Sequence, residues 1–120
     1  EGSRILRGMK TNAANAGTLE ELNTFMLENN TEYRNKKVIL YGSYARGDFR
    51  PDSDIDVMVL VDTDREGVSA LEKKICDVTY DFNDEYGTDI MPVVQSNTHF
   101  DYWKKADMFY RNVEKDGVII

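Results

Sequence analysis

Two aspartates, Asp54 and Asp56, lie two residues apart at the start of the apolar segment DIDVMVLVD. Residues at this spacing in a β-strand point to the same face, so the segment predicts two carboxylates side by side. Such carboxylates repel each other and raise one another's pKa unless a cation lies between them. Mg²⁺ suits this setting, because it binds through one or two carboxylates together with substrate phosphates and water. The pair therefore indicates a magnesium site; the alternative is a polar strand end in solvent.

A turn of small residues precedes this pair. Gly42 and Ser43 follow a strand predicted over residues 38–41, and ten residues separate them from Asp54. Small residues at a strand-to-helix turn let backbone N–H groups approach a phosphate, and a helix N-terminus favours the anion. Arg46 either binds phosphate as well or pairs with Asp48 or Asp52. A phosphate site beside a metal site is the layout of phosphoryl or nucleotidyl transfer, in which metal ions neutralise charge developing in the transition state.

In-line transfer also needs a group near the attacking nucleophile, and Asp89 is the candidate. It lies at the start of the third predicted strand, where a neighbouring strand can bring it beside the aspartate pair. There it would ligate a second metal ion or act as general base toward the acceptor hydroxyl; otherwise it is structural. Asp81, Asp84 and Asp101 are rivals. The first two should lie on a helix and the third near a helix start, where a carboxylate has an ordinary role beside the helix dipole.

The elements that must position these residues alternate along the chain. A capping box, Thr18 with Glu21, predicts a first helix that ends near residue 30. Apolar runs predict strands over residues 38–41, 55–61 and 88–94. Pro92 interrupts the third run, which indicates a strand at the sheet edge or a bulge.

Two further helices are predicted in the second half of the chain. The first begins at a capping box formed by Thr63 and Glu66, carries apolar residues at three- and four-residue spacing, and ends at Gly87. The second runs over 98–113, and an apolar tail at 118–120 follows it. The layout predicts an α+β fold, a two-layer α/β arrangement in which helices pack on a small sheet.

Length and cysteine content limit the class of protein. A chain of 120 residues favours one domain, which we place at 11–120. Residues 1–10 are expected to be a disordered or expression-derived extension, with Met9 a candidate for the natural start. The single cysteine, Cys76, excludes an internal disulfide framework and suits a reducing cytoplasm. No apolar run is long enough to span a bilayer, so neither membrane insertion nor secretion is expected.

Charge limits the partners. The chain has 22 acidic residues against 15 lysines and arginines, for a net charge of −7. Such a surface repels phosphate backbones, so direct binding to long nucleic acid is not expected. A basic protein partner is favoured, or a small anionic ligand whose charge is masked by metal. The alternative is that the acidity only keeps the domain in solution.

The segment GSYARGDFRPDSDIDVMVLV resembles the signature of the nucleotidyltransferase superfamily that shares the DNA polymerase beta-like core. Its pattern is Gly-Ser, ten residues, then Asp-x-Asp, and "PDSD" also matches the common form. The short chain and its ending, VEKDGVII, resemble the minimal nucleotidyltransferase (MNT) group. The resemblance implies a mixed sheet, a nucleoside triphosphate such as ATP, and two Mg²⁺ ions. It implies Gly42 and Ser43 at the phosphates, Asp54 and Asp56 as metal ligands, and Asp89 as the third carboxylate.

The same resemblance implies a partner. Minimal proteins of this group commonly act as antitoxins to HEPN-domain ribonucleases, and members transfer AMP from ATP to a tyrosine of the toxin. Two other functions stay open: an antitoxin that only binds and occludes its toxin, and a nucleotidyltransferase that modifies a small molecule, as in aminoglycoside-modifying relatives. The intact set of acids disfavours the first alternative, and the missing acceptor domain disfavours the second.

Overall fold

A computed structural model of the chain describes residues 34–120, apart from the side chains of residues 34, 35 and 86. The predicted first helix, the extension at 1–10 with Met9, and the start of the predicted domain at residue 11 lie outside the described residues. Within the described part, no helix is both long enough and apolar enough to cross a membrane.

The described strands form one mixed sheet, which confirms the predicted fold class. They are β1 (Arg34–Tyr41), β2 (Ile55–Asp62), β3 (Ile90–Ser96) and β4 (Val118–Ile119), in the spatial order β3-β2-β1-β4. β1 pairs antiparallel with β2 and with β4, whereas β2 and β3 are parallel. The sheet therefore places the segments that carry the three predicted carboxylates on two adjacent strands.

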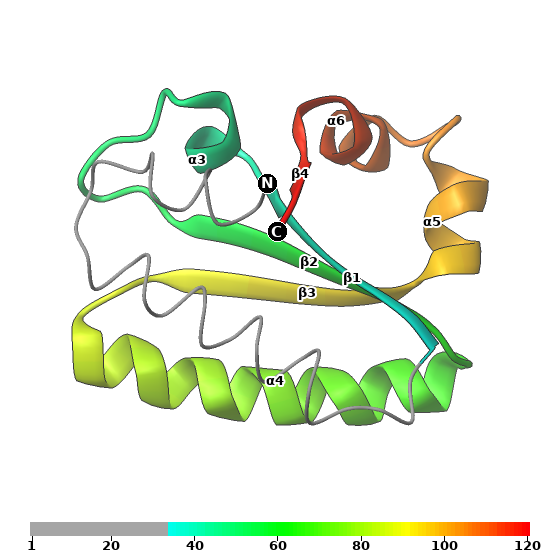
Figure 1. Cartoon of the computed structure of the whole chain (residues 1–120), viewed down its shortest axis with the longest axis horizontal. Coiled ribbons are helices and arrows are strands. Elements are labelled where there is room, and N and C mark those ends of the chain that lie inside the picture. Colours follow the sequence, from blue (N-terminus) through cyan, green and yellow to red (C-terminus); the bar gives the residue numbers. More distant parts are fainter. Residues whose placement is uncertain (1–33) are drawn as a thin grey trace.

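Helices cover both faces of the sheet (Figure 1). They are α3 (Ser43–Arg46), α4 (Arg65–Tyr86), α5 (Asn97–Trp103) and α6 (Met108–Asp116). The long helix α4 connects the parallel strands β2 and β3, which need a crossover because a tight hairpin cannot join them. It runs along one face, and α5 and α6 lie on the other side (Figure 1).

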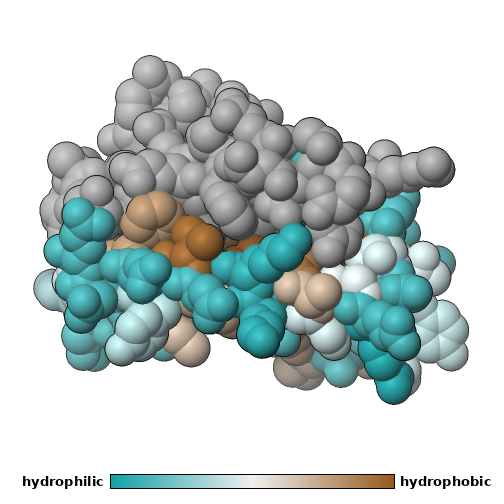
Figure 2. Space-filling model, turned by 90° about the horizontal axis from the view of Figure 1, so that it is seen from below, coloured by the Kyte–Doolittle hydropathy of each residue, from teal (hydrophilic) through white to brown (hydrophobic). Residues whose placement is uncertain are grey.

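β2 is the centre of the core and is buried on both faces. On one face Val57 belongs to the same apolar cluster as Leu71 of α4. On the other face Met58 packs with Phe100 of α5 and Val113 of α6. The outward side of α4 stays polar, and the coloured part of the view from that side is mostly hydrophilic, with a smaller hydrophobic patch (Figure 2). The strand that carries the aspartate pair is thus held rigidly between two helical layers.

The prediction of a single helix over 98–113 is wrong, because residues 104–107 divide it into two helices. α5 begins one residue earlier than predicted, with the Ser96 side chain accepting a hydrogen bond from the His99 N–H at 3.0 Å. A second N-cap, Asp107, accepts from the Phe109 N–H at 2.8 Å and starts α6. An internal Asp can satisfy the free N–H groups of a new first turn, so the chain turns there instead of continuing.

The predicted long helix is confirmed, with one change at its start. Asp64, and not Thr63, is the N-cap, and its carboxylate accepts from the Gly67 N–H at 2.8 Å. The helix ends at Gly87 as predicted, in the left-handed conformation with φ of 66°. The apolar tail docks on the sheet, because β4 pairs with β1. Pro92 lies in β3 at an edge of the described sheet, where its missing N–H is tolerated.

Candidate functional site

The predicted phosphate turn lies between β1 and the one-turn helix α3. Gly42 has φ of 75° and ψ of −154°, a conformation that residues with a Cβ rarely adopt. A Cβ at this position would also overlap the carboxylate of Asp56 on the neighbouring strand. Ser43 opens α3, and the first N–H groups of a helix have no partner within it. Glycine therefore allows a turn with free N–H groups to lie directly against the predicted metal ligand.

The aspartate pair lies at the start of β2, beside this turn. Asp56 pairs in register with Tyr41 at the end of β1, and its side chain is half-buried. Burial raises the pKa of Asp56, and the negative charge of Asp54 raises it further, while Arg46 opposes both effects. Asp54 is exposed just before the strand. The crowding that the sequence predicted for this pair is present in the folded chain.

The third predicted carboxylate, Asp89, comes to the same end of the sheet. The Ile55 N–H donates to the Asp89 backbone oxygen at 2.8 Å, where β3 begins to pair with β2. A side-chain hydrogen bond with Asp54 raises the pKa of Asp89, and burial and the Asp54 charge add to this effect. The structure therefore brings together the side chains of Asp54 and Asp89, which the sequence separates by a whole crossover. Their roles in chemistry stay predictions.

Sequence reasoning missed a residue whose side chain bonds to the residues on both sides of Asp89. Asn83, in the last turns of α4, accepts hydrogen bonds from the Ile90 N–H at 2.9 Å and from the Thr88 hydroxyl at 2.8 Å. Its amide also donates to the Ile90 carbonyl at 3.1 Å. These bonds hold Thr88 and Ile90, the residues before and after Asp89, against the end of α4. No sequence pattern marks Asn83, because an asparagine near a helix end is common.

An Asn83→Ala variant is expected to lose about 1–3 kcal/mol of unfolding free energy, because the partly buried Ile90 backbone groups lose their partners. Urea denaturation measures this loss. The neighbouring Asp84 is exposed on the same helix, so Asp84→Ala serves as the control. Equal midpoints for the two variants would show that the hydrogen bonds of Asn83 contribute nothing to stability.

The three carboxylates fit the predicted metal by the chemistry of their donors. They offer only hard oxygen ligands. Burial is the main cause that raises the pKa of Asp56, and a hydrogen bond with Asp54 is the main cause for Asp89; the negative charge of Asp54 adds to both, and a divalent cation would relieve that repulsion. Between residues 34 and 120, no set of three or more His, Cys, Asp or Glu side chains already has a metal-ligating arrangement. Mg²⁺ would therefore have to draw these side chains together.

The rival carboxylates lie elsewhere, as the sequence indicated. Asp81 and Asp84 are exposed on α4, and Asp101 is exposed on α5, where Lys104 approaches it to 3.5 Å. Tyr44 is buried and its ring stacks on Phe49 at a centroid distance of 4.5 Å, so it packs α3 onto the core. None of these side chains lines the pocket described next.

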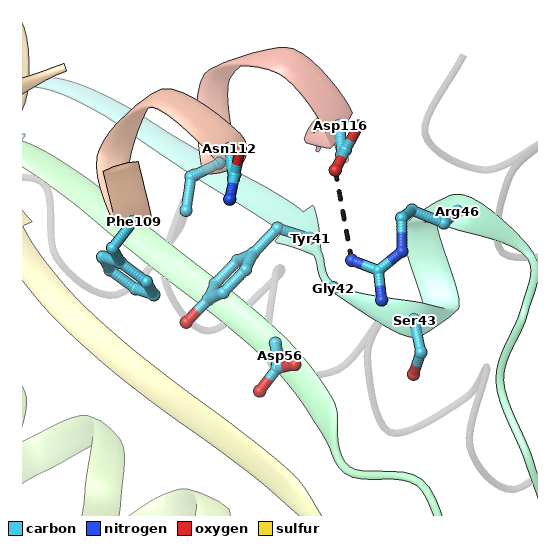
Figure 3. Close-up of a pocket in the computed structure, with 9 residues that line it drawn as sticks. Tyr41, Gly42, Ser43, Arg46, Asp56, Phe109, Asn112 and Asp116 are labelled. Atoms are coloured by element: carbon cyan, nitrogen blue, oxygen red, sulfur yellow. Dashed lines mark ion pairs between the residues drawn. The ribbon is translucent and has the colours of Figure 1, made fainter. Parts of the chain in front are cut away.

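A pocket of about 340 Å³ opens beside the turn (Figure 3). One wall holds motif residues and the end of β1: Tyr41, Gly42, Ser43, Arg46 and Asp56. The other wall belongs to α6: Phe109, Asn112, Val113 and Asp116. The sequence did not predict the second wall. The only signal for this wall is that its residues recur at three- and four-residue spacing, which indicates a helix face that packs on the core or on a partner.

Arg46 joins the two walls. Its guanidinium lies 3.3 Å from the Asp48 carboxylate. It also lies 4.0 Å from the carboxylate of Asp116 on α6 (Figure 3). The structure thus shows the predicted pairing with Asp48 and none with Asp52 among the described contacts. The pair with Asp48 is exposed and therefore weak, and the pair with Asp116 is partly buried but long, so the guanidinium stays available to a stronger anion. Pairing and phosphate binding are therefore compatible for this residue.

Comparison with known proteins gives two kinds of match. Residues 19–118 match the family model described as "Nucleotidyltransferase domain". Over 88 residues the chain is 39% identical to a protein of Methanocaldococcus jannaschii named "Putative protein adenylyltransferase MJ0604", covering 72% of this chain and 79% of the relative. A second protein of that organism, "Putative protein adenylyltransferase MJ0141", is 40% identical over 63 residues, which span 52% of this chain and 61% of the relative.

Proposed function

Because this chain belongs to the nucleotidyltransferase domain family and is a nucleotidyltransferase, we propose that it transfers AMP from ATP to a protein in a magnesium-dependent reaction. One observation carries the proposal. The Gly42 turn lies directly against Asp56, and Asp54 and Asp89 come together at the same end of the sheet, where their interaction raises the pKa of Asp89. This arrangement supports a phosphate site at the turn next to a metal site at the carboxylates, as nucleotidyl transfer requires.

Each residue then has a defined part. The turn of Gly42 and Ser43 binds and orients the triphosphate, which brings the α-phosphorus within reach of the acceptor. The acceptor oxygen forms a bond to that phosphorus as the bond to pyrophosphate breaks, and Asp89 takes the proton of the acceptor hydroxyl. Asp54 and Asp56 would hold Mg²⁺, which would stabilise the negative charge that develops, and Asp89 would ligate a second ion if it is not the base.

The acceptor that we propose is a tyrosine hydroxyl of a basic HEPN-type ribonuclease toxin, in the cytoplasm. A protein acceptor is supported by the names of the two relatives. A basic partner is supported by the net charge of −7, because opposite charges on two proteins speed their association. This attraction weakens as the salt concentration rises. Ribonucleases must bind phosphate and are therefore commonly basic. AMP on a tyrosine near the toxin's RNA site would repel the substrate, so inactivation would outlast the complex.

The toxin is expected to stay inactive after the two proteins are separated, provided that Mg-ATP was present during incubation. Intact mass then shows added AMP, and a ribonuclease assay of the isolated toxin shows lost activity. Full recovery with an unchanged toxin mass would instead indicate an antitoxin that only binds. An unmodified toxin together with modification of an aminoglycoside would indicate the small-molecule enzyme.

Ser43→Ala is expected to weaken ATP binding by about 0.5–3 kcal/mol, the range of one hydrogen bond to a neutral or charged partner. Isothermal titration calorimetry with Mg-ATP measures the change. Ser69 is exposed on α4, so Ser69→Ala is the matched control. An affinity for Ser43→Ala equal to that of the control would remove the hydroxyl from the phosphate site.

A further inference from the structure

The α6 wall of the pocket has no part in the phosphate and metal chemistry described above. Phe109, Asn112 and Asp116 follow one another at three- and four-residue spacing, so they share one face of the helix. Phe109 is 46% exposed and Asn112 is also exposed, so neither is needed to fill the core. These side chains nevertheless face the motif across the pocket (Figure 3).

The aromatic part of this wall suits a flat ligand. The ring of Phe109 meets the ring of Tyr41 edge to face, with centroids 5.7 Å apart and an interplanar angle of 84°. Together they form an aromatic corner that borders the pocket. Any nucleobase offers a π-face that can stack on an exposed aromatic ring. An apolar corner next to a phosphate turn therefore matches the two ends of a nucleotide.

The polar part of the wall suits the edge of a base. The Asn112 amide extends from α6 toward the Tyr41 ring (Figure 3) and has no hydrogen-bond partner among the described residues. An amide offers two donors and an acceptor. This set pairs with N6 and N7 of adenine, an amino donor beside a ring-nitrogen acceptor, whereas guanine presents two acceptors at the same edge. Arg46 and Asp116 tie this end of α6 to the turn, so the two walls keep a common spacing.

We propose that this face of α6 is the nucleobase subsite, in which Phe109 stacks on the base and Asn112 selects adenine. The inference rests on the proposed function, because it assumes that a nucleoside triphosphate binds with its phosphates at Gly42 and Ser43. The pocket volume of about 340 Å³ lies within the range for small-molecule sites.

Calorimetry with three magnesium-loaded ligands separates the subsite from the phosphate site: ATP, GTP and inorganic tripolyphosphate. Phe109→Ala is expected to weaken ATP binding about five-fold to a hundred-fold and to leave tripolyphosphate binding unchanged. Asn112→Leu is expected to weaken ATP binding about five-fold or more and to abolish the preference of ATP over GTP. Phe109→Trp, which keeps a stacking ring, retains the affinity for ATP.

Matched controls lie outside the pocket. Tyr102→Ala removes an exposed aromatic ring from α5, and Lys115→Leu places a leucine on α6 away from the pocket wall. Neither control is expected to change the preference for ATP over GTP. Thermal unfolding of all variants checks that the fold is intact.

The outcomes distinguish the subsite from the function on which it rests. The subsite would be overturned if wild-type protein binds tripolyphosphate and neither Phe109→Ala nor Asn112→Leu changes the affinity for ATP. The phosphate site would stand in that case. Equal losses for ATP and tripolyphosphate would also overturn it, because the wall would then act on the phosphates or the fold. Wild-type protein that binds neither ligand would overturn both the proposed function and the subsite.

Discussion

An Asp56→Asn variant is expected to lose nucleotidyl transfer by two or more orders of magnitude. The amide is a poorer ligand than the carboxylate for a hard cation, and metal ions contribute several kcal/mol to stabilising the charge that develops in such reactions. Since about 1.4 kcal/mol corresponds to a ten-fold change in rate, losing most of that contribution gives a change on the order of 10² to 10³. Single-turnover assays at saturating Mg²⁺ and ATP measure it.

The same substitution is expected to stabilise the metal-free protein. Burial and Asp54 raise the pKa of Asp56, so the folded chain holds the proton more tightly than the unfolded chain does. In wild-type protein this contribution to stability is present at low pH and is lost as the pH rises above about 4, the ordinary range for aspartate. Asparagine carries no charge and avoids that loss. Urea denaturation in EDTA at neutral pH should therefore show a higher midpoint for Asp56→Asn.

Asp81→Asn is the control for both measurements, because Asp81 is an exposed carboxylate on α4, outside the pocket. It removes the same charge from the protein without touching the site. Transfer by Asp56→Asn at the rate of this control, with saturating Mg²⁺, would exclude a ligand role for Asp56.

Gly42→Ala is expected to abolish measurable ATP binding and transfer. The added Cβ would overlap the Asp56 carboxylate, so either the turn or the aspartate must move. The backbone φ of 75° adds strain of about 1–3 kcal/mol for a residue with a side chain. One methyl group thus disturbs the phosphate turn and the predicted metal ligand together, whereas most single changes affect one of them.

Gly47 provides the control that separates the clash from the strain. Its φ is 85°, close to that of Gly42, but an added Cβ would have no atom within 4 Å. Gly47→Ala should therefore lose a similar amount of stability and keep ATP binding. Calorimetry and urea denaturation of the two variants test this difference. Equal ATP affinities for Gly42→Ala and Gly47→Ala would mean that close contact with Asp56 is not needed for the site.

Local patterns in the sequence predicted most of the elements that carry the site. The apolar run in β2, the helical spacing in α4 and the stop at Gly87 each depend on neighbours a few residues away, and each prediction is confirmed. The break between α5 and α6 was missed because Asp107 looks like any polar helix residue until its carboxylate caps the next turn. Capping geometry is decided by where the chain turns, and the apolar period alone does not contain that information.

The residue types and spacing of the motif predicted a glycine turn, an aspartate pair and a distant third carboxylate, in a layout for phosphoryl or nucleotidyl transfer. Close backbone approach and hard oxygen ligands restrict the choice of residue at each position. The resemblance of the motif to a known family then narrowed this chemistry to a nucleotidyltransferase. The partners of these residues come from tertiary structure alone. Asn83 clamps the strand start beside Asp89, and α6 supplies the wall opposite Gly42. Side chains such as Asn83 and Asn112 carry no distinctive pattern, and only the packing of distant segments around β2 gives them their neighbours.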